Sequence, residues 1–505
     1  MRGSSSAGAT TSKIGTIGAF YKYGSSWFHW TGADSGVTAV KYPLENDPHN
    51  RVIFTGLSGL NTVQVTDMTR ATSGANNQYP TNSLDLGLPV PSAPTVLGVA
   101  GTLDEGALND TRFYVCTFVN TFGEEGPPSN PTNPVAAGDG QTVNLQLPSD
   151  PGGRFALASV RVYRLSTGTS GADYLYVGSV AIGTTTMADA VYNDMLGEVL
   201  QTTLFDAPPT NLKGLVTLAG GVLAGFVGDT VYMSEPGFPY AWPANYKHTL
   251  PHEVVGLATI SGGLVALTKG NPYMFQGLTP ASMMPVKIDL PQSCVSANGI
   301  VNLGPVMVYP SPDGLVAISQ GNARVLTEKV FTREQWEALN PSTMVCAHWE
   351  NTLVVFYTQN SVGKCFMFNP LKPDDGIVDL DMGATAVLND LETDRLYFVD
   401  RSSNKIHTFN TGDLLTFTWR SRPVDLPTLT NFGAARLYCD DYVAENTFRL
   451  LVDSSVFHEQ EVRDDLAFRL PSGYRGRRFE IEVEGTETIR EIHLGKTVSE
   501  VKSGQ

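Results

Sequence analysis

Long hydrophobic runs are missing from this 505-residue chain. No window approaches 18 uninterrupted apolar residues, the length at which a membrane-spanning helix becomes a candidate. The opening stretch, MRGSSSAGATTSKIG, contains no apolar core of signal-peptide length. We therefore expect a protein made in the cytoplasm, with no membrane-spanning segment.

Local catalytic signatures are also missing. The HExxH, P-loop, GxSxG and dinucleotide-binding patterns do not occur. Asp374 and Asp375 could suggest a glycosidase pair, but in KPDDG they are typical of a solvated turn. His248 and His252 flank Pro251 and so cannot share a helix face. The sequence predicts no enzyme, no metal site and no cofactor.

Cysteine is scarce, and none of the five cysteines lies in a CxxC pair. Each occupies an apolar run or a turn, so buried free thiols are expected rather than disulfides or zinc ligands. The five are Cys116, Cys294, Cys346, Cys365 and Cys439.

Positive charge is in deficit, with a formal net charge of −16. The balance of Lys and Arg against Asp and Glu is +1 for residues 1–91, −7 for 92–204, −7 for 205–415 and −3 for 416–505. No basic patch stands out, which disfavours attractive nucleic-acid binding.

Glycine and proline, in contrast, are plentiful and scattered, which is typical of many short strands joined by turns. Between residues 211 and 415 a pattern recurs every 40–45 residues: an apolar strand, a turn, a second apolar strand and an aromatic strand. This period predicts propeller blades, with further blades supplied by the N-terminal segment or the C-terminal region. The five units begin at Gly214, Val254, Gly299, Thr343 and Gly383.

One helix is expected, from Thr332 to Leu339, with Thr332 and Gln335 as a capping box and Pro341 as its stop.

Residues 92–204 have a different character. Short strands such as RFYVCTFVN and QTVNLQLP alternate with Gly, Asp and Pro turns, as in an immunoglobulin-like or fibronectin-III-like sandwich. We therefore predict an all-β protein: a β-propeller platform with an inserted β-sandwich and a small C-terminal β-domain. The expected domains are an N-terminal segment completing the platform (1–91), the sandwich (92–204), the blades (205–415) and the C-terminal domain (416–505). Few contacts should cross the Pro-rich boundaries at 89–94 and 207–209.

The stretch VYMSEPGFPYAWPANYK (231–247) leaves a strand and enters a Pro-aromatic-Pro loop. Such a loop could be a ligand platform, a subunit contact or a cover over a hydrophobic core. Its prolines suit a crossing between blades, and its aromatic side chains should be covered. We interpret it as a structural loop or subunit contact comprising Tyr232, Glu235, Pro236, Tyr240, Trp242 and Pro243.

A basic run in SGYRGRRFEI comprises Arg475, Arg477 and Arg478. These arginines could form salt bridges to acids on a neighbouring subunit. The alternative is pairing with Glu480 and its neighbours within the chain.

Six ordered segments carry a family resemblance: YPTNSLDLGLPVP, FVNTFGEEGPPS, VRVYRLSTG, VYMSEPGFPYAWP, WRSRP…TNFGAARL and FRLPSGYRGRRFEIEVEG. In this order the chain resembles the tail nozzle (tail-hub) proteins of short-tailed bacteriophages, from about Trp27 to Leu494. None of the segments is a catalytic motif.

The resemblance implies a virion structural protein in the tail, made in the host bacterial cytoplasm. Its partners would be copies of itself in a ring, usually a hexamer, a tail adaptor or head-to-tail connector protein, and fibre, spike or needle proteins. Exiting double-stranded DNA would touch it transiently and without sequence specificity. Two alternatives stay open: a receptor- or glycan-binding propeller, and a carbohydrate-active propeller enzyme, although the S-x-D-x-G-x-T-W boxes of sialidases are absent.

Overall fold

The computed structural model describes residues 3–7, 15–74, 78–168, 171–261, 263–320, 322–373, 376–444 and 446–502. Asp374 and Asp375 therefore lie outside the described residues. The protein is all-β, as the sequence predicted, and its helices are short. The chain forms two compact units, one of Ser6–His407 and one of Met1–Ser5 with Thr408–Gln505.

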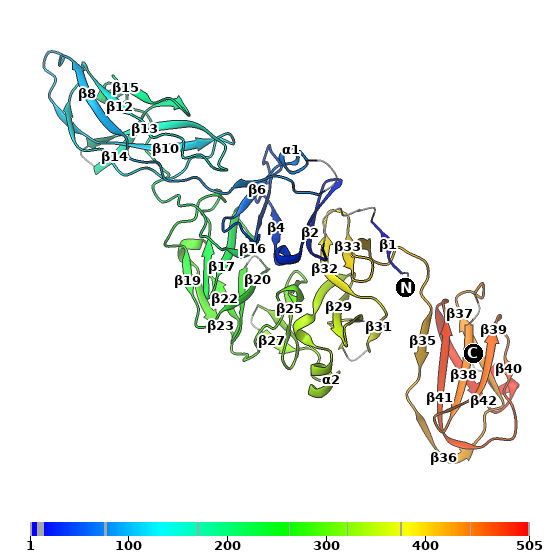
Figure 1. Ribbon diagram of the computed structural model, residues 1–505. Helices are drawn as coiled ribbons and strands as arrows, with labels where there is room; N and C mark the ends of the chain where they lie inside the picture. The colour runs from blue at the N-terminus through cyan, green and yellow to red at the C-terminus, as the bar shows by residue number, and fades with distance from the viewer. Residues whose placement is uncertain are drawn as a thin grey trace. The chain divides into compact units, whose positions relative to one another are not determined.

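Within the described residues, the larger unit contains a propeller of seven antiparallel sheets (Figure 1). The smallest sheet pairs β2 (Ile17–Tyr23) with β3 (Ser26–Thr31). Two four-stranded blades are β4–β7 (Thr38–Lys41, Val52–Thr55, Gln64–Thr66, Leu84–Asp85) and β16–β19 (Lys213–Leu218, Val222–Val227, Thr230–Met233, Lys247–Thr249). Two more are β20–β23 (Val254–Ile260, Gly263–Thr268, Tyr273–Gln276, Met284–Lys287) and β24–β27 (Val301–Asn302, Val306–Ser311, Gly314–Ser319, Asn322–Val325). The last two are β28–β31 (Val345–Trp349, Thr352–Gln359, Val362–Phe368, Val378–Leu380) and β32–β34 (Ala384–Asp390, Arg395–Asp400, Lys405–Thr408), the latter completed by β1 (Ser5–Ser6).

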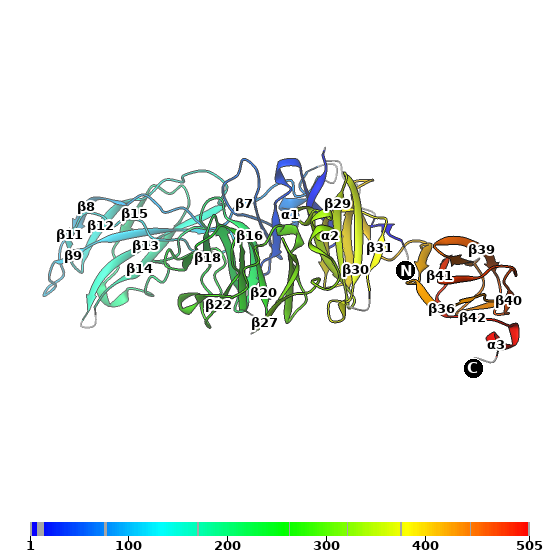
Figure 2. The same ribbon diagram turned by 90° about the horizontal axis from the view of Figure 1, so that it is seen from below.

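The first strand of each blade lies in an inner ring. Strands β4, β16, β20, β24, β28, β32 and β2 contact one another in that order, and β2 contacts β4 to close the circle. Seen from the side, the blades form a flat layer (Figure 2). The five repeats predicted from the sequence are confirmed as the five blades from β16 to β34. The remaining two sheets come from the N-terminal residues.

The blades form because their middle strands are continuous apolar runs. β17, β21 and β26 are buried along almost their whole length, since neighbouring blades cover both faces. The fourth strands are short and mostly exposed, as in β31, which is why the sequence pattern showed only three strands per repeat.

The predicted helix is confirmed as α2 (Arg333–Ala338). Thr332 and Gln335 form the capping box, and Asn340 takes a left-handed conformation just before Pro341. Trp336 anchors the helix in the core between two blades. Other short helical segments of the larger unit are α1 (Met68–Ala71) and the 3₁₀ segments Gly32–Asp34, Asn193–Met195, Pro280–Ser282, Ala297–Gly299 and Pro341–Thr343.

The inserted sandwich leaves the propeller after β7 and returns before β16. One sheet has the order β15-β12-β8 and the other β10-β13-β14, with a short β9-β11 pair beside them. Val143 and Leu145 on the first sheet, and Val160 and Val162 on the second, are fully buried in the sandwich core. The strands are β8 (Thr95–Gly101), β9 (Asp110–Arg112), β10 (Tyr114–Asn120), β11 (Val135–Ala137), β12 (Gln141–Gln146), β13 (Leu157–Gly168), β14 (Gly171–Ala181) and β15 (Thr186–Asp189).

The smaller unit is a β-domain with its own core, in which Phe448, Leu450 and Val483 are fully buried. Its larger sheet has the order β35-β41-β38-β39, with β36 also on β41, and its smaller sheet is β40-β37-β42. The elements are β35 (Phe417–Arg420), β36 (Val424–Thr430), β37 (Ala434–Cys439), β38 (Asn446–Val452), β39 (Ser455–Val462), β40 (Phe468–Arg469), β41 (Gly476–Gly485), β42 (Ile489–Gly495) and α3 (Val498–Lys502).

Candidate functional site at the joint between propeller and sandwich

The propeller and the sandwich meet in one continuous hydrophobic cluster, which we call the joint. We had expected few contacts across the Pro-rich boundaries, and this expectation is wrong. The outgoing linker buries Leu86 and Leu88, and the returning linker buries Phe205. The two linkers touch: a Cβ atom on Gly87 would lie 2.7 Å from Cδ of Pro208.

A tight turn of the sandwich presents a carboxylate at the joint. In FVNTFGEEGPPS, the Asn120 side chain accepts hydrogen bonds from the backbone N–H groups of Phe122 (2.9 Å) and Glu124 (3.0 Å). Gly123 between them has a φ of +82°, a conformation that costs glycine little. Asn120 also donates from Nδ2 to the Glu124 carboxylate at 2.8 Å. The turn therefore holds Glu124 in one orientation.

Glu124 binds a cation from the blade β4–β7. Its Oε1 lies 2.6 Å from Nη1 of Arg51 and accepts a 2.7 Å hydrogen bond from the Tyr42 hydroxyl. Arg51 also pairs with Asp47 at 3.1 Å, and its guanidinium lies 3.7 Å from the centre of the Tyr42 ring. The charged side chains are 5–9% exposed. This ionic network links the sandwich to the propeller in a setting that water does not screen.

Burial and charge act together on the groups of this network. Burial, reinforced by the Glu124 charge, raises the pKa of the Tyr42 hydroxyl, so it stays a donor. Burial opposes the charge of Arg51, but Glu124 and the other partners raise its pKa above the ordinary value. Burial would also raise the pKa of Asp47, yet hydrogen bonds from Arg51 hold it below 3.8. Arg51 and Asp47 are therefore both charged at neutral pH.

The loop at 231–247 packs against the same joint. Trp242 is 3% and Tyr240 7% exposed. The Trp242 indole donates to the carbonyl of Pro239 at 3.0 Å, and its backbone N–H donates to the carbonyl of Asp206 at 2.8 Å. The Tyr240 ring centre lies 5.9 Å from that of Phe205 on the returning linker. Burial, followed by the Glu124 charge, raises the pKa of Tyr240.

The other predicted residues of this loop are less deeply placed. Pro243 is buried, while Tyr232, Glu235 and Pro236 are half-buried. Tyr232 lies in β18 opposite Lys247. The backbone N–H of Glu235 donates to the carbonyl of Ala241, which folds the loop back on itself.

Sequence reasoning missed the ionic network. Asp47 and Arg51 are four residues apart in a loop, and Arg51 and Glu124 are 73 residues apart, so no local period relates them. The signal that was present is the FGEEGPPS segment itself, which the resemblance singled out without giving a role to its first glutamate.

The three arginines of the C-terminal β-domain are exposed on or beside β41. Among the described residues, no ion pair joins them to Glu480 or its neighbours; Arg420 binds Glu480 at 2.8 Å, and Arg449 binds Glu482 at 3.0 Å. The side chains of Arg475, Arg477 and Arg478 are exposed at the surface of this domain.

The cysteines are free, as expected; Cys439 is half-buried and the others are buried. No group of three or more His, Cys, Asp or Glu side chains among the described residues could hold a metal ion. Over the same residues, no helix has the length and apolar character needed to cross a membrane.

A scan against protein-family models and a search of curated proteins find no match. Similar solved structures include BamB from Moraxella catarrhalis, 8% identical, covering 63% of this chain and 95% of that chain with a TM-score of 0.26. The extracellular domain of the hybrid two-component system BT3049 from B. thetaiotaomicron is 12% identical and covers 94% of this chain and 71% of that chain, with a TM-score of 0.28. Hsv2 from Kluyvelomyces marxianus is 9% identical and covers 64% of this chain and 94% of that chain, also with a TM-score of 0.28. The propeller assignment rests on the strand pairing of this chain.

Proposed function

We propose that this protein is a structural component of a phage virion that forms the ring-shaped tail nozzle through which DNA leaves, and that it is not an enzyme. The observation that carries the proposal is where the resembling segments lie. YPTNSLDLGLPVP, FVNTFGEEGPPS and VYMSEPGFPYAWP converge on the joint and supply Leu86, Glu124 and Trp242 to it. These segments are the parts of the chain that fix the sandwich to the propeller.

The remaining segments build the interior of single domains. In VRVYRLSTG, Arg164 pairs at 2.7 Å with Asp189 in the sandwich, and both side chains are at most 1% exposed. WRSRP…TNFGAARL and FRLPSGYRGRRFEIEVEG supply β37, β40 and β41 to the C-terminal β-domain. A protein that must keep its shape while DNA passes needs such internally braced parts, which supports a scaffold role.

The nozzle channel would lie between subunits rather than inside one chain. The axis of a single propeller is narrow and normally filled by side chains. A closed ring of identical copies can enclose a wider lumen, because cyclic symmetry places the same surface of every copy around the axis. The exposed arginines of the C-terminal β-domain are candidates for inter-subunit salt bridges within such a ring.

Charge also fits a channel that releases DNA. Each phosphate neutralised by a protein cation adds salt-dependent affinity. Residues 92–204 and 205–415 each carry a net charge of −7, so a wall built from them would repel the duplex over about 8 Å at physiological salt. A connector above the ring and fibre, spike or needle proteins around it complete the proposed assembly.

Negative-stain microscopy combined with mass photometry of the purified chain tests the proposal. We expect closed rings with a central hole and a mass that is an integral multiple of the 54.4 kDa subunit. Particles of one subunit at every concentration up to tens of micromolar would contradict it. A glycan array on the same preparation covers the adhesin alternative, and specific glycan binding without rings would favour that function instead.

A further inference from the structure

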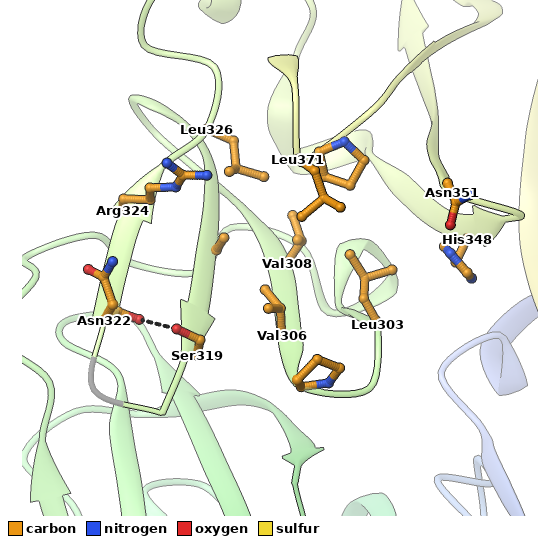
Figure 3. Close-up of a pocket in the computed structure, with 13 residues that line it drawn as sticks. Leu303, Val306, Val308, Ser319, Asn322, Arg324, Leu326, His348, Asn351 and Leu371 are labelled. Carbon is orange, nitrogen blue, oxygen red and sulfur yellow. Dashed lines mark hydrogen bonds between the residues drawn. The ribbon is translucent and has the colours of Figure 1, made fainter.

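An apolar pocket of about 350 Å³ lies between the blade β24–β27 and the blade β28–β31. Leu303, Val306, Val308, Ala317, Leu326 and Leu371 line it. Figure 3 shows Val306, Val308 and Leu371 around a common space, with Arg324 at its side. Leu371 is 77% exposed, so the pocket opens to the surface. The cavity is large enough to take up an apolar side chain from outside.

The rim of the pocket carries a cation, Arg324. Arg324 is exposed, and among the described residues it forms no ion pair. Asn322, His348 and Asn351 supply further polar groups at the rim. An apolar cavity beside a guanidinium is complementary to an apolar side chain that stands next to a carboxylate.

The same chain displays such a group on another blade. The turn between β32 and β33 exposes 92% of Leu391. Glu392 follows it, with 83% of its side chain exposed and only a distant contact, 3.9 Å, to Lys41, whose side chain is 61% exposed. We call this turn, residues 390–394, the acidic turn.

The acidic turn is held rigid by its first residue. The Asp390 carboxylate accepts hydrogen bonds from the backbone N–H of Glu392 (3.1 Å) and from the hydroxyl of Thr393 (2.6 Å). It also pairs with Lys22 of β2 at 2.5 Å. Leu391 is therefore presented on a preordered turn, which reduces the entropy lost when it binds.

We propose that the acidic turn of a second copy of this chain binds in the pocket, with Leu391 in the apolar cavity and Glu392 paired with Arg324. Pocket and turn are different surfaces of one chain, so a contact that a second copy does not return is head-to-tail and can propagate until a ring closes. This inference rests on the proposed ring and names the contact that builds it. Leu278 is fully exposed too, but no acid adjoins it, so it lacks the charge that Arg324 selects.

A charge swap tests the pairing. Arg324→Glu and Glu392→Lys should each weaken self-association of the full chain by at least about tenfold, because a like-charge contact replaces an attractive one. The double variant should return to within about threefold of the wild type, since the pair is restored with reversed signs. Leu391→Asp should abolish assembly without affecting folding, because the side chain is exposed in the monomer. Mass photometry over a dilution series gives the dissociation constants.

Two matched controls share the chemistry but not the location. Lys329→Glu reverses an exposed charge five residues from Arg324, and Leu278→Asp places a charge on another exposed leucine. Both should assemble like the wild type. Thermal melts that match the wild type show that each variant is folded.

The outcomes separate this inference from the proposed function. Wild-type rings that persist in all three pocket and turn variants would overturn the contact and leave the nozzle proposal standing. Loss of assembly in Arg324→Glu alone, with Glu392→Lys and Leu391→Asp unaffected, would mean that the pocket receives a different occupant and would also overturn it. A wild-type chain that never self-associates would overturn both.

Discussion

Replacing Arg51 with methionine should destabilise the protein and allow the sandwich and the propeller to unfold independently. The change keeps much of the apolar volume but removes the cation, so the carboxylates of Asp47 and Glu124 lose their charged partner in a site where all three side chains are 5–9% exposed. Removing one partner of a buried ion pair costs about 3–5 kcal/mol. Differential scanning calorimetry should show this as a lower melting temperature. The single unfolding transition of the wild type should also split into two, one for the propeller and one for the sandwich, because the core that they share is weakened.

The matched control is Arg333→Met, because Arg333 has the same partners in kind, Asp313 and Glu337, but is 71% exposed. That variant should lose at most about 1 kcal/mol, as exposed ion pairs do. Equal melting temperatures for the two variants would refute the claim that the buried network holds the joint.

The difference in stability between the wild type and Arg51→Met should depend on pH. Arg51 lowers the pKa of Asp47 below its usual 3.8 despite the opposing effect of burial. A group whose pKa is lower in the folded state contributes stability above its unfolded pKa and loses it as pH falls through the folded value. The stability difference between wild type and Arg51→Met should therefore be largest near neutral pH and shrink below about pH 4. A difference that grows on acidification would show that the pair is not the cause.

Two further predictions follow from burial. Trp242→Ala should lower the free energy of unfolding by about 3–5 kcal/mol, as large core truncations do. The control Phe238→Ala, in the same loop but 41% exposed, should lower it far less. Equal thermal midpoints for Trp242→Ala and wild type would contradict the packing of this loop. Burial raises the pKa of Cys116 and Cys294 to about 12 and that of Cys439 to about 11. In the native protein at pH 8, a thiol reagent should therefore modify Cys439 first. Peptide mapping that finds a buried cysteine labelled first would contradict this order.

The repeating part of the fold was predictable because its signal is local. Strands such as β21 and β26 are apolar from end to end, turns separate them at regular intervals, and neighbouring blades cover both of their faces. The fourth strand of each blade pairs through its backbone while its side chains face solvent, so strands such as β31 left little trace in the sequence. The number of blades could not be counted, because the two-stranded sheet β2–β3 does not repeat the pattern.

The joint was not predictable in the same way. Its linkers are rich in proline, which indicated a sparse boundary, but Leu86, Leu88 and Phe205 between the prolines are buried against both domains. The ionic network depends on residues brought together only by the tertiary fold, as Arg51 and Glu124 are. The loop at 231–247 was interpreted more fully, because buried Tyr and Trp side chains dominate packing wherever a rigid loop presents them.

The central claim is that copies of this chain enclose a DNA duplex, and a topological measurement tests it most directly. The protein is assembled in the presence of a covalently closed circular plasmid, washed at a salt concentration that removes electrostatic binding, and sedimented. The account predicts that rings remain with the circular DNA and are released when a restriction enzyme cuts it once, because linked rings slide off a free end. Rings that never stay with the circle, or protein that stays equally on cut and uncut DNA, would contradict it.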